Sequence, residues 1–418
     1  MKRFLMIGGV AVAVIVAILL NSLVKHGEDV ATCESLIAEL DKDEPGVAER
    51  VSEKLRDDDI SIWFPMLIEA AGKDNPTMRR NAITVLGHKE HLVQNDERSE
   101  TVDLLMKALD DDDVFARREA VRVVTAPYRY RESAAKLREI IKTQTEGKYR
   151  PVAVAALEGL GLIAGEGDAD LIKEYVSNAD DMVRLGAVKG LGNVATVNAL
   201  RVLLGILPSE KNLLVRIRII CDVGELGEEL RGKGADNQAV GVLAGMLKNE
   251  KVISLMLQKA EAGSVKDEFR EVLDIPVPLP GSEEDKGYGL EKHFFFRLLV
   301  SLYQWNEGDL YTVLLKRLLS ASGDEQDVFE GAVIAYVDFL LNPGGKEAYL
   351  RVKIGEEDIT RLKEIGGMLI SFLNTKSGDF AASNLRRITG KNHGDSVSDW
   401  KAQFEHYASG EEEFKPGG

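Results

Sequence analysis

The sequence predicts an all-α protein, an α-solenoid of stacked helix pairs that follows one transmembrane helix. The first observation behind this prediction is a phrase that recurs as "NPTMRRNAITVLGH", "ADDMVRLGAVKGLGNV" and "EKNLLVRIRIICDVGELG". The second is an amphipathic stretch before most copies, such as "ETVDLLMKALDDDD". The third is a single apolar run near the N-terminus. Two helices per repeat, at intervals of about 31 to 38 residues, are typical of an α-solenoid.

The apolar run covers residues 4–24 and follows two basic residues, Lys2 and Arg3. As a helix it would be about 31 Å long, which is enough for one crossing of a bilayer. No small-residue cleavage site of the signal-peptide type follows it. Because positive charge precedes the span, its N-terminus is expected in the cytoplasm. The sequence therefore predicts residues 1–28 as a transmembrane anchor with a short linker.

The recurring phrase has a fixed apolar frame. We number it from its basic residue, so that positions −1, +3 and +7 lie on one face of a helix. All 18 residues at these positions, three in each of six copies, are apolar. This face is predicted to be the core-facing side of the second helix in each pair. Position zero falls at Ala48, Arg79, Arg117, Ala153, Arg184 and Arg216.

Polar residues and glycines mark the ends of these second helices. Asp and Asn in "KDNPT", "DDDDV" and "NADDM" are expected to cap the helix starts, because a side-chain oxygen accepts a hydrogen bond from an amide of the first turn. A glycine at position +8 is expected to let the chain leave the helix. This glycine occurs in four copies, as Gly87, Gly161, Gly192 and Gly224.

The phrase "DDMVRLGAVKGLG", with its Asp-rich turn, "VR", an alanine three residues later and a final "LG", resembles a HEAT repeat of the short bacterial type. The resemblance covers residues 44–227 well and extends more weakly to about 340. A tetratricopeptide array is the competing interpretation, but only 6% of the residues are aromatic. The HEAT resemblance implies a ladder of position-zero arginines that pair with turn carboxylates, broken at Ala48 and Ala153. The ladder arginines would be Arg79, Arg117, Arg184 and Arg216.

Composition places the end of the solenoid, which is predicted over residues 29–273. The next stretch, "DIPVPLPGSEEDKGYG" at 274–289, contains alternating prolines and then glycines and acids. Proline lacks the amide that a helix needs, so this stretch is predicted to be a loop.

The C-terminal part, residues 290–409, is predicted as degenerate helical repeats that end in a capping module. This module is similar to one in bacterial HEAT-like proteins, with a Thr-Gly turn before a helix that carries two aromatic residues. Trp400 and Phe404 lie one helical turn apart and are expected to cover the end of the stack. The last residues, 410–418, are predicted to be a disordered tail.

The sequence gives no indication of catalysis. It contains no phosphate-binding loop, serine-hydrolase, zinc-protease or paired CxxC motif. Its two cysteines, Cys33 and Cys221, would be several repeats apart in a solenoid and are expected to be free thiols. A net charge of −16 disfavours nucleic acid as the main partner. We therefore expect a protein without enzyme activity, cofactor or metal.

One basic surface is predicted in this acidic chain. Positions +1, +5 and +9 of the second helix point away from the core. In HEAT-like arrays this helix lines the concave face, so the resemblance implies a partner-binding groove there. The alternative is that these are ordinary exposed residues that favour a helix. The basic residues on this face would be Arg80, Arg118, Arg122, Lys189 and, one position away, Arg218.

Together these features predict a membrane-anchored scaffold that binds protein partners. We expect it in a bacterial inner membrane, with a cytoplasmic N-terminus, the membrane bound through the N-terminal helix, and the solenoid on the periplasmic side. The alternative is an enzyme or chaperone like the bilin lyases, which share the short repeats and bind a tetrapyrrole in the solenoid groove. Covalent transfer of a bilin to an acceptor protein would distinguish the two.

Overall fold

The computed structural model describes residues 29–57, 60–163, 166–230, 239, 241–243, 297–298, 300–301, 324–341, 356–375, 377–394, 396–409 and 414. Every regular element in these residues is a helix. The chain divides into two compact units, Met1–Ile172 and Lys173–Gly418, which we describe separately as unit 1 and unit 2. The predicted anchor over 1–28 and the predicted loop over 274–289 lie outside the described residues.

The prediction of a single-pass inner-membrane protein is corrected. In the part of the chain that the structure describes, no helix is both long enough and apolar enough to span a bilayer. The 18-residue helices α12 (Leu213–Leu230) and α18 (Asp324–Leu341) carry charged residues along their length. The apolar run at 4–24, from which the anchor was predicted, is not among the described residues.

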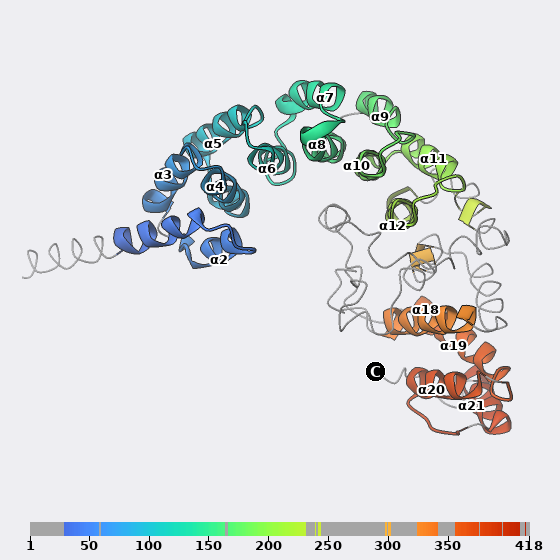
Figure 1. The fold of residues 1–418 in the computed structure, drawn as a ribbon. Coiled ribbons are helices and arrows are strands. Elements are labelled where there is room, and N and C mark those ends of the chain that lie inside the picture. The colour runs from blue at the N-terminus through green and yellow to red at the C-terminus, as the bar shows by residue number, and fades with distance from the viewer. Residues whose placement is uncertain are drawn as a thin grey trace, which may run out of the picture. The chain divides into compact units, whose positions relative to one another are not determined.

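Unit 1 consists of stacked helix pairs. In Figure 1 the first helices α3, α5 and α7 lie along one side of the unit, and the second helices α4, α6 and α8 lie along the other. Each second helix contacts the next, in the order α2, α4, α6 and α8. A helix at 29–38 precedes the elements η1 Glu39–Asp41, α2 Val47–Lys54, α3 Ile60–Ala71, α4 Pro76–His88, η3 Glu90–Leu92, α5 Asn95–Ala108, α6 Val114–Thr125, η4 Arg131–Ser133, α7 Ala134–Thr143, η5 Gly147–Tyr149 and α8 Arg150–Ile163.

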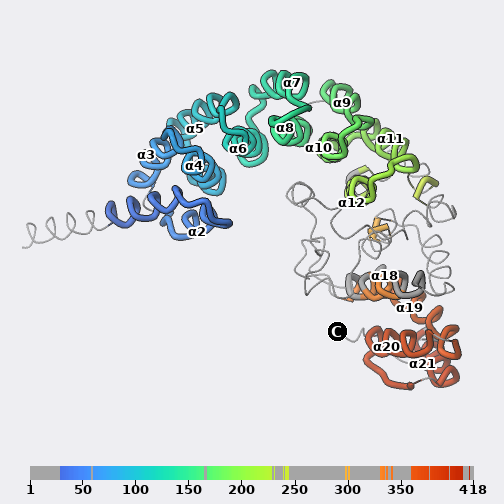
Figure 2. The backbone as a smooth tube through the Cα atoms, in the orientation of Figure 1, coloured from blue at the N-terminus to red at the C-terminus, as the bar shows by residue number. Residues whose placement is uncertain are grey.

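Unit 2 begins with the same kind of helix pair. Helix α9 (Glu166–Lys173) lies at the boundary of the units, and α10 (Asp181–Val194) packs on both α11 (Val197–Ile206) and α12. Figure 2 follows the backbone through these helices and through the C-terminal group. That group contains α18, which contacts α19 and α20, and α19, which contacts α20 and α21; the bounds of the last three are Glu356–Ile370, Gly378–Thr389 and Val397–Ser409.

The predicted core frame is confirmed. Of the 18 residues at positions −1, +3 and +7, all except the half-exposed Met78 are buried. The predicted caps are also present, because the side chains of Asn75, Asp113 and Asp180 each accept hydrogen bonds from two amides in the first turn of α4, α6 and α10. The recurring phrase therefore encodes a capped second helix that buries one apolar face.

The role predicted for the glycines at position +8 is wrong. All four lie inside second helices and end none of them. A Cβ added to Gly87 would lie 2.8 Å from Val123 Cγ2, and one added to Gly192 would lie 2.7 Å from Asp222 Cγ. The glycines therefore allow position +8 of one second helix to approach position +6 of the next.

At the contact between α6 and α8 the glycine is on the other helix. Position +8 is occupied by Thr125, and position +6 of the next repeat is Gly159. A Cβ on Gly159 would lie 2.5 Å from Thr125 Oγ1 and 2.8 Å from its Cγ2. Each of these crossings thus has one glycine, and the repeats differ in which helix supplies it.

The C-terminal module has an aromatic core. Trp400 is completely buried, its Nε1 donates to the Gly394 carbonyl at 2.9 Å, and its ring meets that of His393 edge to face at 4.7 Å. Phe414 belongs to the tail that was predicted to be disordered. It is only 6% exposed, however, and its ring lies 5.0 Å from that of Tyr407. The tail therefore reaches this core at Phe414.

Two adjacent glycines of α19 provide a test of this packing. A Cβ on Gly366 would overlap the ring of Phe404 from α21, whereas nothing lies within 4 Å of a Cβ on Gly367. We expect Gly366→Ala to lower the free energy of unfolding of the module by about 1–2 kcal/mol, because the ring must move. Gly367→Ala should not lower it, since alanine favours a helix. Hydrogen exchange of the α19–α21 amides in the full chain would measure both, and equal effects would contradict this packing.

Candidate functional site

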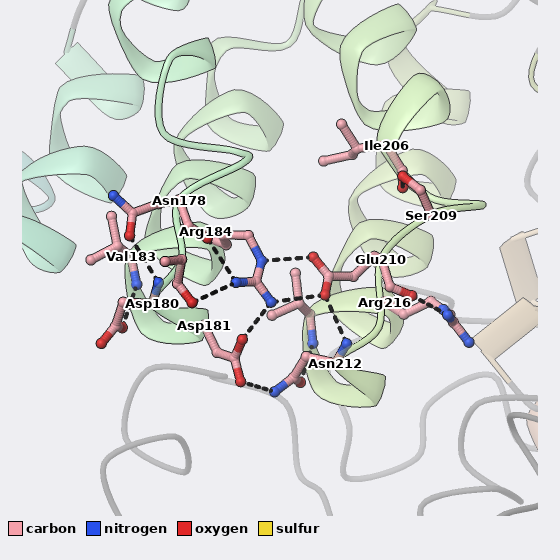
Figure 3. A network of polar contacts seen from close by, with 12 residues as sticks. Asn178, Asp180, Asp181, Val183, Arg184, Ile206, Ser209, Glu210, Asn212 and Arg216 are labelled. Atoms are coloured by element: carbon pink, nitrogen blue, oxygen red, sulfur yellow. Dashed lines mark hydrogen bonds and ion pairs between the residues drawn. The ribbon is translucent and has the colours of Figure 1, made fainter.

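The ladder predicted between repeats is formed in unit 2 by Arg184 (Figure 3). Its Nε and Nη2 donate to the two carboxylate oxygens of Glu210, each at 2.9 Å. Its Nη1 donates to the carbonyls of Asn178 at 2.8 Å and Ala179 at 3.2 Å, and its Nη2 also pairs with Asp181. Arg184 therefore holds the turn before its own helix and joins it to the next turn.

Glu210 is the second connection in this network (Figure 3). Its Oε1 accepts a hydrogen bond from the amide of Asn212 at 2.7 Å, and Asn212 in turn caps α12 by accepting from Leu214 and Val215. The carbonyl of Glu210 accepts a hydrogen bond from Arg216. One residue thus links the arginine of one repeat to the cap and the arginine of the next.

The same connections recur in unit 1. Arg79 Nε and Nη2 donate to the Asp111 carboxylate at 2.8 and 2.7 Å, and Arg79 Nη1 donates to the carbonyls of Lys73 and Asp74. Asp111 also accepts from the amide two residues later, and its carbonyl accepts from Arg117 Nε at 2.7 Å. Burial alone would raise the pKa of Asp111, but hydrogen bonds from Arg79 and that amide hold it below the ordinary value.

The other two predicted ladder residues differ. Arg117 donates to the amide oxygen of Gln144 at 3.5 Å and lies over the ring of Tyr149 at 4.4 Å, instead of pairing with a carboxylate. The side chain of Arg216 donates to the Glu210 carbonyl, and its burial lowers the pKa of the guanidinium. A further bidentate pair, from Arg138 to Asp168, was not predicted and joins α7 to α9.

The five residues of the predicted basic face do not form one exposed stripe. Arg80 pairs with Asp43 at 2.9 Å, and its side chain is 25% exposed. Lys189 is only 6% exposed, and the Arg218 side chain is 12% exposed and paired with Asp222. The prediction that Lys189 and Arg218 lie on an open groove is therefore wrong. The reason is that α10 and α12 are buried on both faces, as Leu185 and Ile217 at position +1 show.

Unit 2 contains a buried charged cluster at this place. Asp222 is 1% exposed, and burial raises its pKa to about 7, although Arg218 opposes this shift. Burial also raises the pKa of the adjacent Cys221 thiol to about 11, so this thiol is protonated at neutral pH and a poor nucleophile. Cys33 and Cys221 are both free, as predicted, and both buried.

An exposed patch remains on α6 of unit 1. Phe115 is 48% exposed and is the one large apolar side chain among the described residues that is exposed. The Arg118 guanidinium lies 5.6 Å from its ring centre, and Arg122 is 59% exposed at the side chain. Both arginines contact Glu119, at 3.6 and 3.3 Å. We call Phe115, Arg118 and Arg122 the α6 patch; they follow one another at intervals of three and four residues and so share one helix face.

The sequence identified the two arginines of this patch but missed Phe115. Position −2 is also apolar in two other copies, at Met182 and Leu214, and both of those side chains are buried. Residue type at this position therefore gives no signal of exposure. Within the described residues, no group of three or more His, Cys, Asp or Glu side chains is placed to hold a metal ion.

Comparison with known proteins supports the repeat architecture. No curated protein matches the chain. Among solved structures, an engineered protein has 13% sequence identity, and the similarity covers 91% of this chain and 95% of that chain with a TM-score of 0.36. At that TM-score the fold assignment rests on the helix pairs of the chain itself. Residues 64–158, which include α4, α5 and α6, match the family model of HEAT repeats. We therefore identify residues 64–158 as HEAT repeats.

Proposed function

We propose that the protein is a non-catalytic repeat scaffold that binds another protein through the α6 patch. The observation that supports this proposal is the exposed Phe115 between two arginines on one helix face. Aromatic residues and arginine are enriched at the centres of protein interfaces, whereas an isolated large apolar side chain on the surface stays in contact with water at a cost. HEAT repeats provide the rigid frame on which such a patch is held.

The chemistry of the patch indicates the kind of partner. Covering a phenylalanine ring contributes roughly 1.5–3 kcal/mol, so the partner should offer an apolar surface to Phe115. Arg118 is already restrained by the ring and by Glu119, and therefore loses little side-chain entropy on binding. Arg122 is exposed enough to pair with a second carboxylate. A partner with an apolar side chain flanked by acidic residues fits these features.

A photo-crosslinking side chain at position 115 tests the proposal in the native host. We expect it to capture a defined partner, and the same side chain at the exposed Lys142 of α7, on the other side of unit 1, should not. Phe115→Ala with Arg122→Ala should weaken the binding of that purified partner at least about tenfold. Stability should change by less than about 0.5 kcal/mol, since both side chains are exposed. Identical capture from both positions, or unchanged affinity, would exclude the patch as a binding surface.

A further inference from the structure

Unit 1 has a groove between its first helices α3 and α5. The groove has a volume of about 680 Å³. Its apolar lining includes the half-exposed Ile68 from α3 and Leu104 from α5. These helices lie on the side of unit 1 opposite to α4 and α6 (Figure 1). The groove and the α6 patch are therefore on different faces of the same unit.

Carboxylates line the α5 wall of this groove. Asp96, Glu100 and Asp103 are exposed, and their spacing of four and three residues places them on one helix face. None of them forms an ion pair with a described residue, unlike Asp111 at the end of the groove, which Arg79 holds. Like charges at this spacing cost roughly 0.2–0.5 kcal/mol per pair. The folded unit thus carries a row of carboxylates that its own cations do not neutralise.

The α6 patch has the chemistry that this groove lacks. Its two arginines are four residues apart, or about 6 Å along a helix, as are Asp96 and Glu100. Phe115 could be covered by Ile68 and Leu104, which are apolar and partly exposed. A copy of the chain cannot make this contact with itself, because its patch and groove face opposite sides of unit 1.

We propose that the α6 patch of one copy binds in the α3–α5 groove of a second copy of this chain, so that the protein assembles head to tail. The proposal rests on the proposed role of the α6 patch and names its partner. The interface joins two different surfaces, so each added copy leaves one patch and one groove open for the next. The net charge of −16 repels copies at long range, but salt screens this repulsion beyond about 8 Å, and the local contact then decides.

Two variants of the full chain test the proposal by sedimentation. The groove variant carries Glu100→Lys and Asp103→Lys, and the patch variant carries Phe115→Ala and Arg122→Ala. We expect the wild-type mass to rise beyond that of a dimer with concentration, and each variant alone to lose this rise. An equimolar mixture should form a 1:1 dimer and nothing larger, because it offers only one intact patch and one intact groove per pair.

Controls separate this contact from general charge effects. Glu53→Lys with Glu132→Lys makes the same charge change at exposed sites outside the groove and should assemble like the wild type. Thermal unfolding should show that all variants are folded. The proposal is overturned if the wild type stays at one-chain mass, if the groove variant assembles normally, or if the mixture forms no dimer. In those cases capture of another protein from position 115 would leave the proposed function standing; loss of that capture would overturn both.

Discussion

Arg184→Ala is expected to lower the free energy of unfolding of unit 2 by about 3 kcal/mol, the cost of removing one partner from a buried ion pair. The substitution leaves the Glu210 carboxylate, whose side chain is 5% exposed, without its bidentate partner. It also leaves the carbonyls of Asn178 and Ala179 without the donor that closes the turn. Urea unfolding of the full chain, followed by circular dichroism, would measure the loss.

A matched exposed pair shows whether burial is the cause. Arg50 and Glu44 form an ion pair in which the side chains are 44% and 61% exposed, so Arg50→Ala should cost less than about 1 kcal/mol. Arg184→Ala combined with Glu210→Ala should cost less than the sum of the two single changes, because no buried charge is then left alone. Equal losses for Arg184→Ala and Arg50→Ala would show that the ladder contributes no more than a surface pair.

The sequence predicts the second helices well because their signals are local. The apolar frame repeats with the period of a helix, and a cap needs only one polar residue just before the first turn. The ladder is also encoded, but in a position that the repeat phrase did not include. The acceptors Asp111 and Glu210 both lie six residues before position zero of their repeat, and each follows a repeat with arginine at zero.

The ladder departs from the prediction where this acceptor is absent. The residue six before Ala153 is Gly147, so Arg117 in the preceding repeat has no carboxylate there and uses Gln144 and Tyr149. The residue six before Arg184 is Asn178, which follows a repeat with alanine at zero. An acid at this position therefore accompanies an arginine one repeat earlier, and a search for that pair of positions would have found which arginines have carboxylate partners.

The exposed face could not be derived from the repeat frame alone. A frame with one apolar side assumes that the opposite side meets water, and this holds for Arg122 on α6. In unit 2 the second helices are covered on both sides, which buries Lys189. The change is visible at position +1, which is arginine in α6 but leucine or isoleucine in α10 and α12. What covers a helix depends on contacts distant in sequence, and a repeat pattern does not contain them.

The glycines were misinterpreted for a related reason. A glycine near the end of an apolar phrase is typical of a helix end, but here the helices continue through it. Its use becomes clear only when two repeats are compared, because position +8 of one second helix meets position +6 of the next. Where Thr125 replaces the glycine at +8, Gly159 appears at +6 of the following helix. This exchange indicates that the contact, and not the helix end, requires the small residue.

Gly159→Ala is therefore expected to destabilise unit 1 by about 2 kcal/mol, although alanine favours a helix by up to ~1 kcal/mol over glycine. The new Cβ would lie 2.5 to 2.9 Å from all three heavy atoms of the Thr125 side chain beyond its Cα. Thr125 is 1% exposed and its hydroxyl donates to the Val121 carbonyl at 2.8 Å, so it has no free space into which to move. Urea unfolding of the full chain would measure the change.

A compensating substitution decides whether this crossing is the cause. Thr125→Ala removes the two atoms nearest to the new Cβ, so Gly159→Ala should cost little when it is added to Thr125→Ala. Gly205→Ala in α11 is the control, because nothing lies within 4 Å of its added Cβ, and it should be neutral or slightly stabilising. If Gly159→Ala costs the same with and without Thr125, the helices do not approach each other at this pair, and the glycine exchange between repeats has another origin.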